Sequence, residues 1–248
     1  MPSSPAPRIA VVTGAAGGMG RAITAQLLSD GLHVTGIDID GGALSAMAAD
    51  LGPAFTPETI DLTDPASIAA CFTQIAARSG GIDALVNNAG TCFMSDFPDI
   101  PAAELDRQMA VNFSSAFHCC QSAVKAMRGR SGIRKIVNIS SNGAYNFDVF
   151  DPPHYRASKA AMDTLTKDLA RRYASDGIAV NSIAPAMTET PLFNVLTADV
   201  LARALAAMPR GHAMRPEEVA AWVGFLISPA GDISSGNVII LNQGRDVR

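Results

Sequence analysis

Residues 8–28 join a short apolar segment to a cluster of glycines and then to a stretch with helical spacing. Residues 8–12 have the pattern of a short buried strand, and the turn after them contains Gly14, Gly18 and Gly20. Glycine lets the backbone turn tightly and lets another group approach it closely. The start of the following helix offers free N–H groups and a partial positive charge, which attract a phosphate. Strand, glycine turn and helix in this order therefore predict a site for the pyrophosphate of a dinucleotide.

Short apolar runs alternate with helical patterns along the rest of the chain. Strands separated by helices are typical of a parallel sheet that is covered on both faces. We therefore expect an α/β, doubly wound fold of the Rossmann type, with a mostly parallel sheet and helices on both faces. The expected strands are residues 8–12, 33–38, 54–60, 82–87, 134–139, 178–183 and 237–241. The expected helices are residues 21–28, 65–78, 104–127, 154–174, 200–207 and 217–227.

The chain of 248 residues is long enough for one well-filled core, and no repeat or linker divides it. We expect residues 8–248 to form a single dinucleotide-binding catalytic domain. Residues 1–7 lack the basic and apolar blocks of a secretion signal and are expected to be a disordered tail. Residues 186–215 contain prolines, one short helical pattern and no strand, which favours a lid over the site. A pair of surface helices is the plainer interpretation of the same segment.

Composition argues against several classes of partner. The formal net charge is -4 and there is no dense basic run, so we expect no nucleic acid partner. No apolar stretch approaches the ~20 residues of a membrane span, so we expect no membrane association. The cysteines have no metal-ligand spacing, which predicts no metal site and favours reduced thiols in a cytoplasmic protein; they are Cys71, Cys92, Cys119 and Cys120.

A second signal lies at residues 140–159. Tyr155 and Lys159 are spaced to share one face of the expected helix, and Ser140 and Ser141 end the apolar run before it. A free phenol has a pKa of about 10, and a cation a few ångströms away lowers that pKa by roughly 1–3 units. The pair therefore predicts a tyrosine that acts as an acid and a base. Most pairs with this spacing are solvated helix faces, so the prediction depends on the glycine turn upstream.

Together these motifs resemble those of the short-chain dehydrogenase/reductase family, in its compact single-domain branch. The resemblance covers nearly the whole chain, from Arg8 to Gly244. Single motifs of this length occur by chance, but a full set in the family's order is specific. The matching segments are Thr13 to Gly20 (TGxxxGxG), Asn87 to Gly90 (NNAG), Asn112, Val137 to Ser141, Tyr155 to Lys159 (YxxxK) and Pro185 to Thr190 (PGxxxT).

The resemblance implies a role for each catalytic residue. Tyr155 would give a proton to a carbonyl oxygen, or take one from an alcohol. Lys159 would favour the phenolate and hold the nicotinamide ribose, and a serine would stabilise charge on the substrate oxygen. Asn112 would position a water that connects Lys159 to solvent. The plainer alternatives are that Asn112 only ties its helix to a neighbouring strand, and that the serines only end a strand.

The identity of the catalytic serine depends on the alignment. Aligning the strand without gaps places the family's serine at Ser141, whereas the early Gly143 favours Ser140. We choose Ser141, because the register of a strand fixes which side chains face the site. Two further departures are Ala186, where the family has glycine, and Gln243, where a double glycine is common. Because alanine tolerates positive φ poorly, we expect a slightly different backbone beside the nicotinamide.

The choice of cofactor rests on Asp38 at the end of the second expected strand. A carboxylate there accepts hydrogen bonds from the adenosine ribose and repels a 2′-phosphate. Its neighbours are neutral and Arg21 is expected to point elsewhere, so we expect NAD rather than NADP; the alternative role of Asp38 is to cap a turn. The expected cofactor-binding residues are Gly14, Gly18, Met19, Gly20, Asp38, Asp61, Leu62, Asn88, Ala89, Gly90, Tyr155, Lys159, Pro185, Thr188 and Thr190.

The residues expected to face the substrate are mixed in character. The apolar ones favour a hydrophobic ketone or secondary alcohol, and the polar ones leave a sugar or polyol open. An anionic substrate is less favoured, because no cluster of arginine or lysine marks the loop before Tyr155. The expected residues are Cys92, Phe93, Met94, residues 142–150, His154 and the segment from Met187 onward.

Two broader hypotheses complete the expectations. A non-catalytic nucleotide sensor or scaffold with this fold usually lacks the tyrosine or the lysine, and both are present here. The resemblance also implies a homo-oligomer, either a tetramer or a dimer, that assembles through the helices expected at residues 104–127 and 155–174. The expected partner is otherwise a small-molecule alcohol or ketone.

Overall fold

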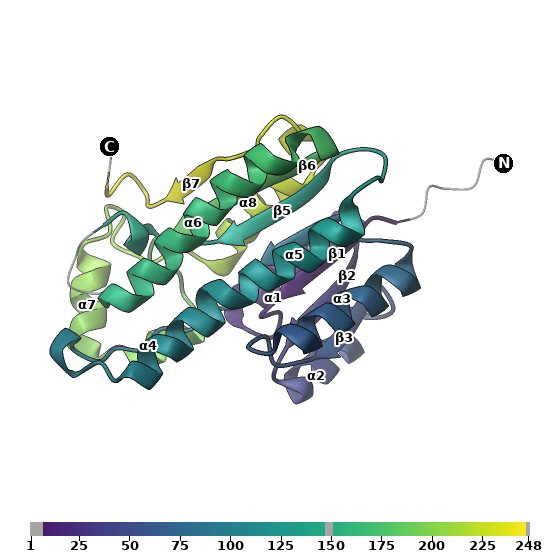
Figure 1. Ribbon diagram of the computed structural model, residues 1–248. Helices are drawn as coiled ribbons and strands as arrows, with labels where there is room; N and C mark the ends of the chain where they lie inside the picture. The colour runs from purple at the N-terminus through teal and green to yellow at the C-terminus, as the bar shows by residue number, and fades with distance from the viewer. Residues whose placement is uncertain (1–6, 147–150, 247–248) are drawn as a thin grey trace.

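The computed structural model describes residues 7–146 and 151–246. Its centre is a seven-stranded parallel sheet with the strand order β3-β2-β1-β4-β5-β6-β7 (Figure 1). The strands are β1 (Ile9–Thr13), β2 (His33–Asp38), β3 (Phe55–Thr59), β4 (Ala84–Asn87), β5 (Arg134–Ile139), β6 (Ile178–Pro185) and β7 (Val238–Leu241). The strand order reverses between β1 and β4, and in such sheets ligands bind beyond the carboxyl ends of the strands at the reversal.

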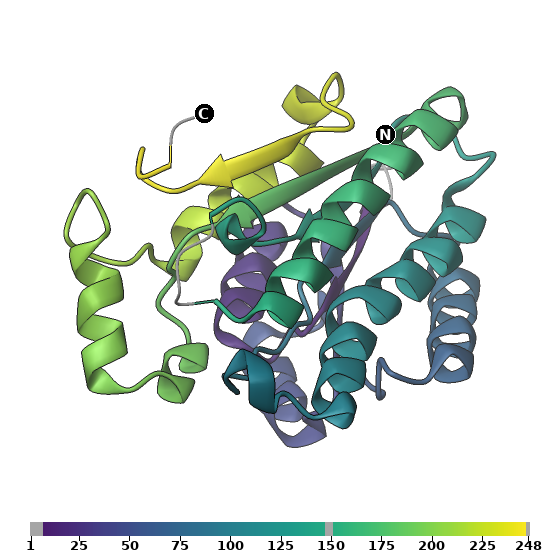
Figure 2. The same cartoon turned by 60° about the vertical axis from the view of Figure 1, so that its left-hand side comes forward.

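Helices cover both faces of the sheet, so the expected fold class is confirmed. Figures 1 and 2 show α3, α5 and α6 in front of the sheet, with α1, α2 and α8 behind it. The helices are α1 (Gly18–Ser29), α2 (Gly41–Leu51), α3 (Pro65–Ser79), α4 (Ala102–Met109), α5 (Ser115–Met127), α6 (Pro153–Tyr173), α7 (Ala198–Ala206) and α8 (Pro216–Ile227). The expected tail at residues 1–7 lies almost entirely outside the described residues.

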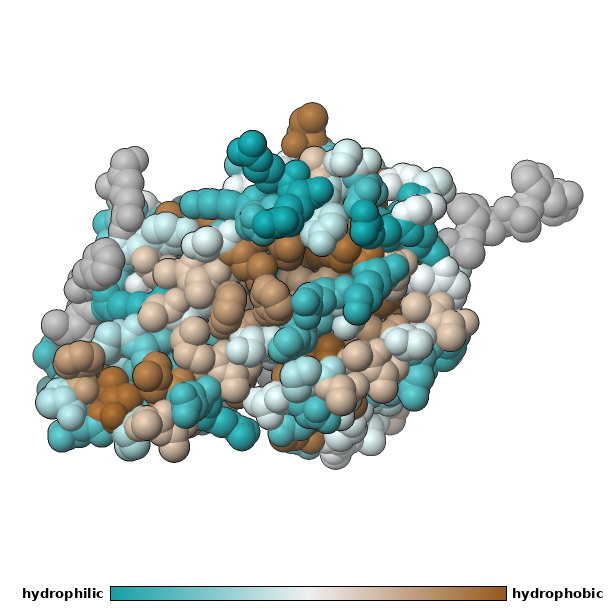
Figure 3. All heavy atoms as spheres, viewed as in Figure 1, coloured by the Kyte–Doolittle hydropathy of each residue, from teal (hydrophilic) through white to brown (hydrophobic). Residues whose placement is uncertain are grey.

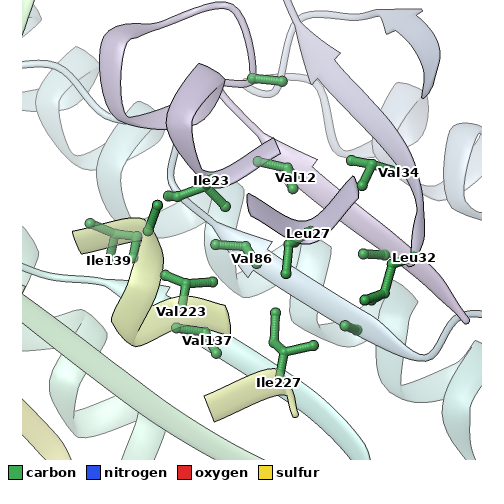
Figure 4. Close-up of a cluster of buried hydrophobic side chains, with 14 of the residues drawn as sticks. Val12, Ile23, Leu27, Leu32, Val34, Val86, Val137, Ile139, Val223 and Ile227 are labelled. Carbon is green, nitrogen blue, oxygen red and sulfur yellow. The ribbon is translucent and has the colours of Figure 1, made fainter. Parts of the chain in front are cut away.

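The core consists of two apolar layers, one on each face of the sheet. Because side chains alternate along a strand, Val12 packs into the layer under α1 and α8 while Val11 packs into the opposite layer. Figure 4 shows the first layer, in which Ile23 and Leu27 of α1 lie against Val86 of β4. Each such fully buried side chain contributes about 1.5–3 kcal/mol relative to its exposed state.

Two elements differ from the expectation. The structure has a helix α2 that we did not expect; it begins after Asp40, whose carboxylate accepts a hydrogen bond of 2.9 Å from the N–H of Ala43. The single helix expected at residues 104–127 is interrupted by a π-helical turn at Ala110–Ser114, so that α4 and α5 are separate. π-turns inside helices often occur at functional sites.

The segment expected to be a lid contains a short 3₁₀ helix η5 (Pro191–Val195) and α7. Its two ends meet in a parallel bridge between Thr188 and Met214. Figure 2 shows α7 standing apart from the sheet, beside the end at which β6 and β7 finish. The segment therefore lies at the carboxyl ends of the strands, where the site is expected.

Candidate active site

Two adjoining clefts lie beyond the carboxyl ends of the strands. The larger has a volume of about 340 Å³ and the smaller about 150 Å³. Met19 and Thr190 line both, so the two clefts meet. Eleven of the expected cofactor-binding residues line the larger cleft: Gly14, Gly18, Met19, Gly20, Asp38, Asp61, Leu62, Asn88, Ala89, Gly90 and Thr190.

The glycine turn and the loop after β4 form the floor of the larger cleft. Gly14 has φ +63°, and a Cβ atom on it would lie 2.8 Å from Cα of Ala89. The side chain of Asn88 donates to the carbonyls of Thr13 (3.1 Å) and Gly14 (3.0 Å). The hydroxyl of Thr13 accepts from the N–H groups of Asn88 and Ala89. Only glycine allows this close contact, and it leaves the backbone open towards the cleft.

The start of α1 provides the expected anion site. The N-cap is Gly17, and no side chain caps the helix. A Cβ atom on Gly20 would overlap the carbonyl oxygen of Gly14, so glycine is needed where the helix begins against the turn. The N–H groups of a first helical turn have no partner within the helix and carry partial positive charge. These features fit the pyrophosphate of a dinucleotide.

Asp38 ends β2 at the far side of this cleft. Its carboxylate accepts from the N–H of Ala16 (3.0 Å) and from the N–H of Asp40 (3.1 Å), so backbone groups fix its position. Arg21 donates to the carbonyl of Ala16 at 2.9 Å and does not line the cleft. Arg107, which the sequence did not indicate, lines the cleft from α4. An adenosine ribose at this end of the cleft is therefore expected to meet the Asp38 carboxylate.

Ser141 and Tyr155 face each other in the smaller cleft. Ser141 follows β5, its hydroxyl accepts a hydrogen bond of 3.0 Å from the N–H of Gly143, and it is hydrogen-bonded to the Tyr155 hydroxyl. The hydroxyl of Ser140 points the other way and lies 2.9 Å from the carboxylate of Asp163. The structure thus places Ser141, and not Ser140, beside Tyr155.

Lys159 lies one turn after Tyr155 on α6 and is buried. Its ammonium donates to the carbonyl of Ile139 at 2.8 Å and lies 6.0 Å from the centre of the Tyr155 ring. Burial lowers the pKa of Lys159 to about 8, while Asp163 raises it. Burial also raises the pKa of Tyr155, and the charge of Asp151 adds to this, whereas the hydrogen bond with Ser141 opposes it. The pKa of Tyr155 is therefore raised overall and not lowered as expected, because burial is the largest cause of its shift.

Asn112 lies in the π-turn between α4 and α5 and is fully buried. Its amide oxygen accepts from the N–H of Thr91 (2.8 Å), and its amide nitrogen donates to the carbonyl of Thr91 (2.9 Å) and to Ser158 (3.1 Å). Asn112 therefore ties the turn to the loop after β4 and to α6, as in the plainer interpretation. The amide oxygen of Asn112 and the ammonium of Lys159 both lie beside Gly90. The expected role of Asn112 in positioning a water stays a prediction.

The other expected residues are distributed unevenly. Cys92, Met94, Asn142, Pro185 and Thr188 line the smaller cleft with Tyr155. The residues 147–150 of the expected substrate loop lie outside the described residues. The expectation for His154 is wrong, because its ring is buried against Glu104, with 3.2 Å between Nε2 and the carboxylate.

The lid segment contributes to the smaller cleft as expected, through Phe193, Leu196 and Ala204. Arg245 and Asp151 also line this cleft and were not among the residues expected to face the substrate. Ala186 does not have a positive φ, so alanine is accommodated there without that strain, and the expected difference from the family's backbone stays a prediction. Gln243 has φ 59° instead, and its side chain bonds the N–H of Arg210 and the carbonyl of His212. These two bonds compensate for the strain of a left-handed backbone at a residue other than glycine.

Residues 7–146 and 151–246 contain neither a membrane-spanning helix nor a cluster of metal ligands. No helix there combines the length and the apolar character needed to cross a bilayer. No three histidine, cysteine or acidic side chains of the same ranges are grouped so that they would hold a metal ion.

Comparison with known proteins assigns the family. A family model described as enoyl-(acyl carrier protein) reductase matches residues 14–246. Cis-4-hydroxycyclohexanecarboxylate dehydrogenase of Sinomonas cyclohexanicum is 38% identical, and the match covers 96% of both chains. The 3-oxoacyl-(acyl-carrier-protein) reductase of Escherichia coli K12 is 34% identical, with 96% of both chains covered.

A solved structure has the same fold. The RhlG protein of Pseudomonas aeruginosa in complex with NADP superposes with a TM-score of 0.90 and 30% identity, covering 98% of this chain and 97% of that one. The chain belongs to the short-chain dehydrogenase/reductase family. It is an oxidoreductase of the kind that acts on alcohols and ketones, and it has the nicotinamide-cofactor fold of that family.

Proposed function

We propose that the protein is an NAD-dependent dehydrogenase/reductase that interconverts a small secondary alcohol and its ketone. One observation carries the proposal: the hydrogen-bonded hydroxyls of Tyr155 and Ser141 lie in a small pocket that adjoins the dinucleotide cleft. A substrate oxygen between these hydroxyls receives two hydrogen bonds, which stabilise the charge that develops on it. A nucleotide sensor or scaffold without catalytic activity does not need two hydroxyls placed together in this pocket.

In the reductive direction Tyr155 gives its proton to the substrate oxygen. The raised pKa of Tyr155 keeps the phenol protonated at neutral pH, which suits this step. Ser141 donates a hydrogen bond to the same oxygen, and Gly143 holds the hydroxyl of Ser141 in place through its N–H. A nicotinamide cofactor held in the larger cleft would supply the hydride in reduction and accept it in oxidation. In the oxidative direction Tyr155 takes the proton, aided by the positive charge of Lys159.

The lining of the smaller cleft supports a compact, mostly apolar substrate. Its volume of about 150 Å³ suits a molecule with few carbons, such as a cyclic secondary alcohol. Its apolar lining residues include Met94, Met187, Phe193, Leu196 and Ala204. The relative from Sinomonas cyclohexanicum is named for cis-4-hydroxycyclohexanecarboxylate, a cyclic secondary alcohol that also carries a carboxylate, and its cyclic alcohol supports the same class for this chain.

A sugar or polyol is the second candidate. Asp151 raises the pKa of Tyr155 through its charge and lies against Gly143, where a larger side chain would displace its carboxylate. Asn142 lines the same cleft. A carboxylate and an amide beside the reacting oxygen suit a substrate with a second hydroxyl next to the first.

The preference for NAD rests on Asp38, whose fixed carboxylate lines the cleft. The structure of RhlG with NADP is the contrary precedent, so the preference needs direct measurement. We also propose a cytoplasmic location, since all four cysteines are buried free thiols.

We propose a homo-oligomer as the working state. On α4 and α5, Leu105 and Phe117 leave 44% and 37% of their area exposed. Figure 3 shows apolar side chains gathered on the face formed by α5 and α6. Light scattering coupled to size exclusion tests this, because a mass of 25.7 kDa identifies a monomer.

The test of the activity is a coupled panel of small alcohols and ketones read by NADH absorbance. Cyclic secondary alcohols, linear secondary alcohols and polyols are compared with NAD and with NADP at equal concentration. Turnover of cyclic alcohols supports the first candidate, and turnover of polyols alone supports the second. A protein that binds NAD and turns over no member of the panel in either direction contradicts the proposal.

A further inference from the structure

The active site contains a buried acid that the proposed reaction does not use. Asp163 lies one helical turn after Lys159 on α6, and only 3% of its area is exposed. A buried carboxylate is costly unless hydrogen bonds and an opposite charge compensate for the loss of water. Its position beside two catalytic residues, and not on the surface, calls for a physical explanation.

Three hydroxyl groups from three elements converge on Asp163. Ser182 of β6 lies 2.6 Å from one carboxylate oxygen, Ser140 after β5 lies 2.9 Å from the other, and Tyr145 is also hydrogen-bonded to it. An ionised carboxylate only accepts hydrogen bonds, so it satisfies all three donors at once. The network therefore holds the charged form, although burial raises the pKa of Asp163.

The charge of Asp163 acts on Lys159. The groups that face Lys159 from the surrounding elements are the Tyr155 ring on α6, the Cys92 thiol after β4 and the carbonyl of Ile139 on β5. None of these groups carries a negative charge at neutral pH, because burial raises the pKa of both the thiol and the phenol. Within the described part of the chain, Asp163 is the carboxylate that raises the pKa of Lys159.

Asp163 also orients the end of β5. The carbonyl of Lys159 lies 3.2 Å from the Ser140 hydroxyl, and the N–H of Ser140 donates to Ile183 on β6. Ser140 is thus bonded to α6 and β6, and Ser141 follows it directly. Loss of the carboxylate removes the nearer acceptor of two buried serine hydroxyls, and leaves Ser140 and Ser182 only backbone carbonyls at 3.2 Å, next to the catalytic serine.

We propose that Asp163 is a positioning residue of the active site, whose carboxylate keeps the buried Lys159 cationic and fixes the strand end that carries Ser141. The catalytic meaning of this inference rests on the proposed function, but the charge relation between the two side chains does not. Removal of the carboxylate therefore makes Lys159 lose its proton at a lower pH.

The direct test is the titration of Lys159 by NMR in protein labelled with ¹³C-lysine. The chain has only four lysines, Lys125, Lys135, Lys159 and Lys167, so the spectrum is simple. Disappearance of one ¹³Cε signal in Lys159→Met assigns it. We expect the titration midpoint of Lys159 in Asp163→Asn to fall by about 1 pH unit or more, the size of shift expected from one nearby charge. An unchanged midpoint overturns the inference.

The matched control is Thr166→Val. Thr166 is buried on the same helix and accepts a hydrogen bond of 2.8 Å from Asn138 of β5, but it has no charge. This variant should leave the Lys159 midpoint in place, and an equal shift in both variants also overturns the inference. If Asp163→Asn does not fold, Asp163→Ser removes the same charge and leaves room for a water molecule.

Enzyme activity provides the second readout. The alkaline fall of kcat/KM should move to lower pH in Asp163→Asn by the same amount as the NMR midpoint, and Asp163→Glu should restore the wild-type profile. A shifted midpoint in a protein without dehydrogenase activity supports the charge relation and contradicts only the proposed function. An active enzyme with an unshifted midpoint contradicts only the inference about Asp163.

Discussion

Replacement of Asp38 by asparagine tests the basis of cofactor choice. A 2′-phosphate with about two negative charges, placed roughly 5 Å from one carboxylate, is repelled by about 1.7 kcal/mol even at the dielectric constant of water. This energy corresponds to about 20-fold in relative affinity. The carboxylate is half-buried and held by two backbone N–H groups at 3.0 and 3.1 Å, so it does not swing away. We therefore expect Asp38→Asn to raise the ratio of kcat/KM for NADP to that for NAD at least 20-fold.

The assay measures initial rates with both coenzymes at low ionic strength, where the repulsion is least screened. Asp40→Asn is the matched control, because Asp40 lies two residues away, caps α2 and does not line the cleft. It makes the same change in net charge and should leave the ratio within about twofold of wild type. Equal ratios in wild type and Asp38→Asn refute the electrostatic explanation, and a similar rise in both variants shows that only the overall charge matters.

Three further predictions concern pH, thiols and the glycine turn. In the reductive direction kcat/KM should fall as pH rises through about 8, because Lys159 loses its positive charge there. Tyr155 stays protonated over this range, since its pKa is raised. A pH profile of kcat/KM that stays flat to pH 10 contradicts this prediction. All four thiols should react slowly with Ellman's reagent in the native protein, because burial raises the pKa of each, and all should react at once in guanidinium; a fast native thiol is the contrary result. Gly20→Ala should lower the Tm and the free energy of unfolding, the latter by about 1–3 kcal/mol, because the new Cβ overlaps the backbone of Gly14. The control Gly42→Ala in α2 has room for its Cβ and should not lower the Tm. Equal Tm values for the two variants refute the overlap.

The sheet was predictable because its strands are short apolar runs between polar turns. The bounds of β2 (His33–Asp38) and β5 (Arg134–Ile139) agree with the expected ranges at both ends. Pro57 in β3 is tolerated because β3 pairs only with β2, at the edge of the sheet. The π-turn around Asn112 was not predictable, since helical spacing continues on both sides of it. It depends on bonds to Thr91 and Ser158, which are distant in sequence.

The two halves of the site differ in how much the sequence reveals. The dinucleotide cleft is built from local motifs, so Gly14, Gly18 and Asp38 were identified with their surroundings. The substrate cleft combines the loop before α6, the lid segment and the C-terminal end of the chain, so no motif announces Asp151 or Arg245. Burial caused the remaining error: sequence spacing places a lysine near a tyrosine but does not tell how strongly desolvation raises the pKa of the phenol.

The most direct test of the central claim compares Tyr155→Phe with wild type in two measurements, NADH-linked turnover and NAD affinity by fluorescence. General acid–base catalysis contributes about 10²–10⁴-fold, so kcat should fall by at least that lower factor while the dissociation constant of NAD stays within about threefold. Tyr173→Phe, at the far end of α6, is the control and should keep full activity. Normal turnover in Tyr155→Phe contradicts the account.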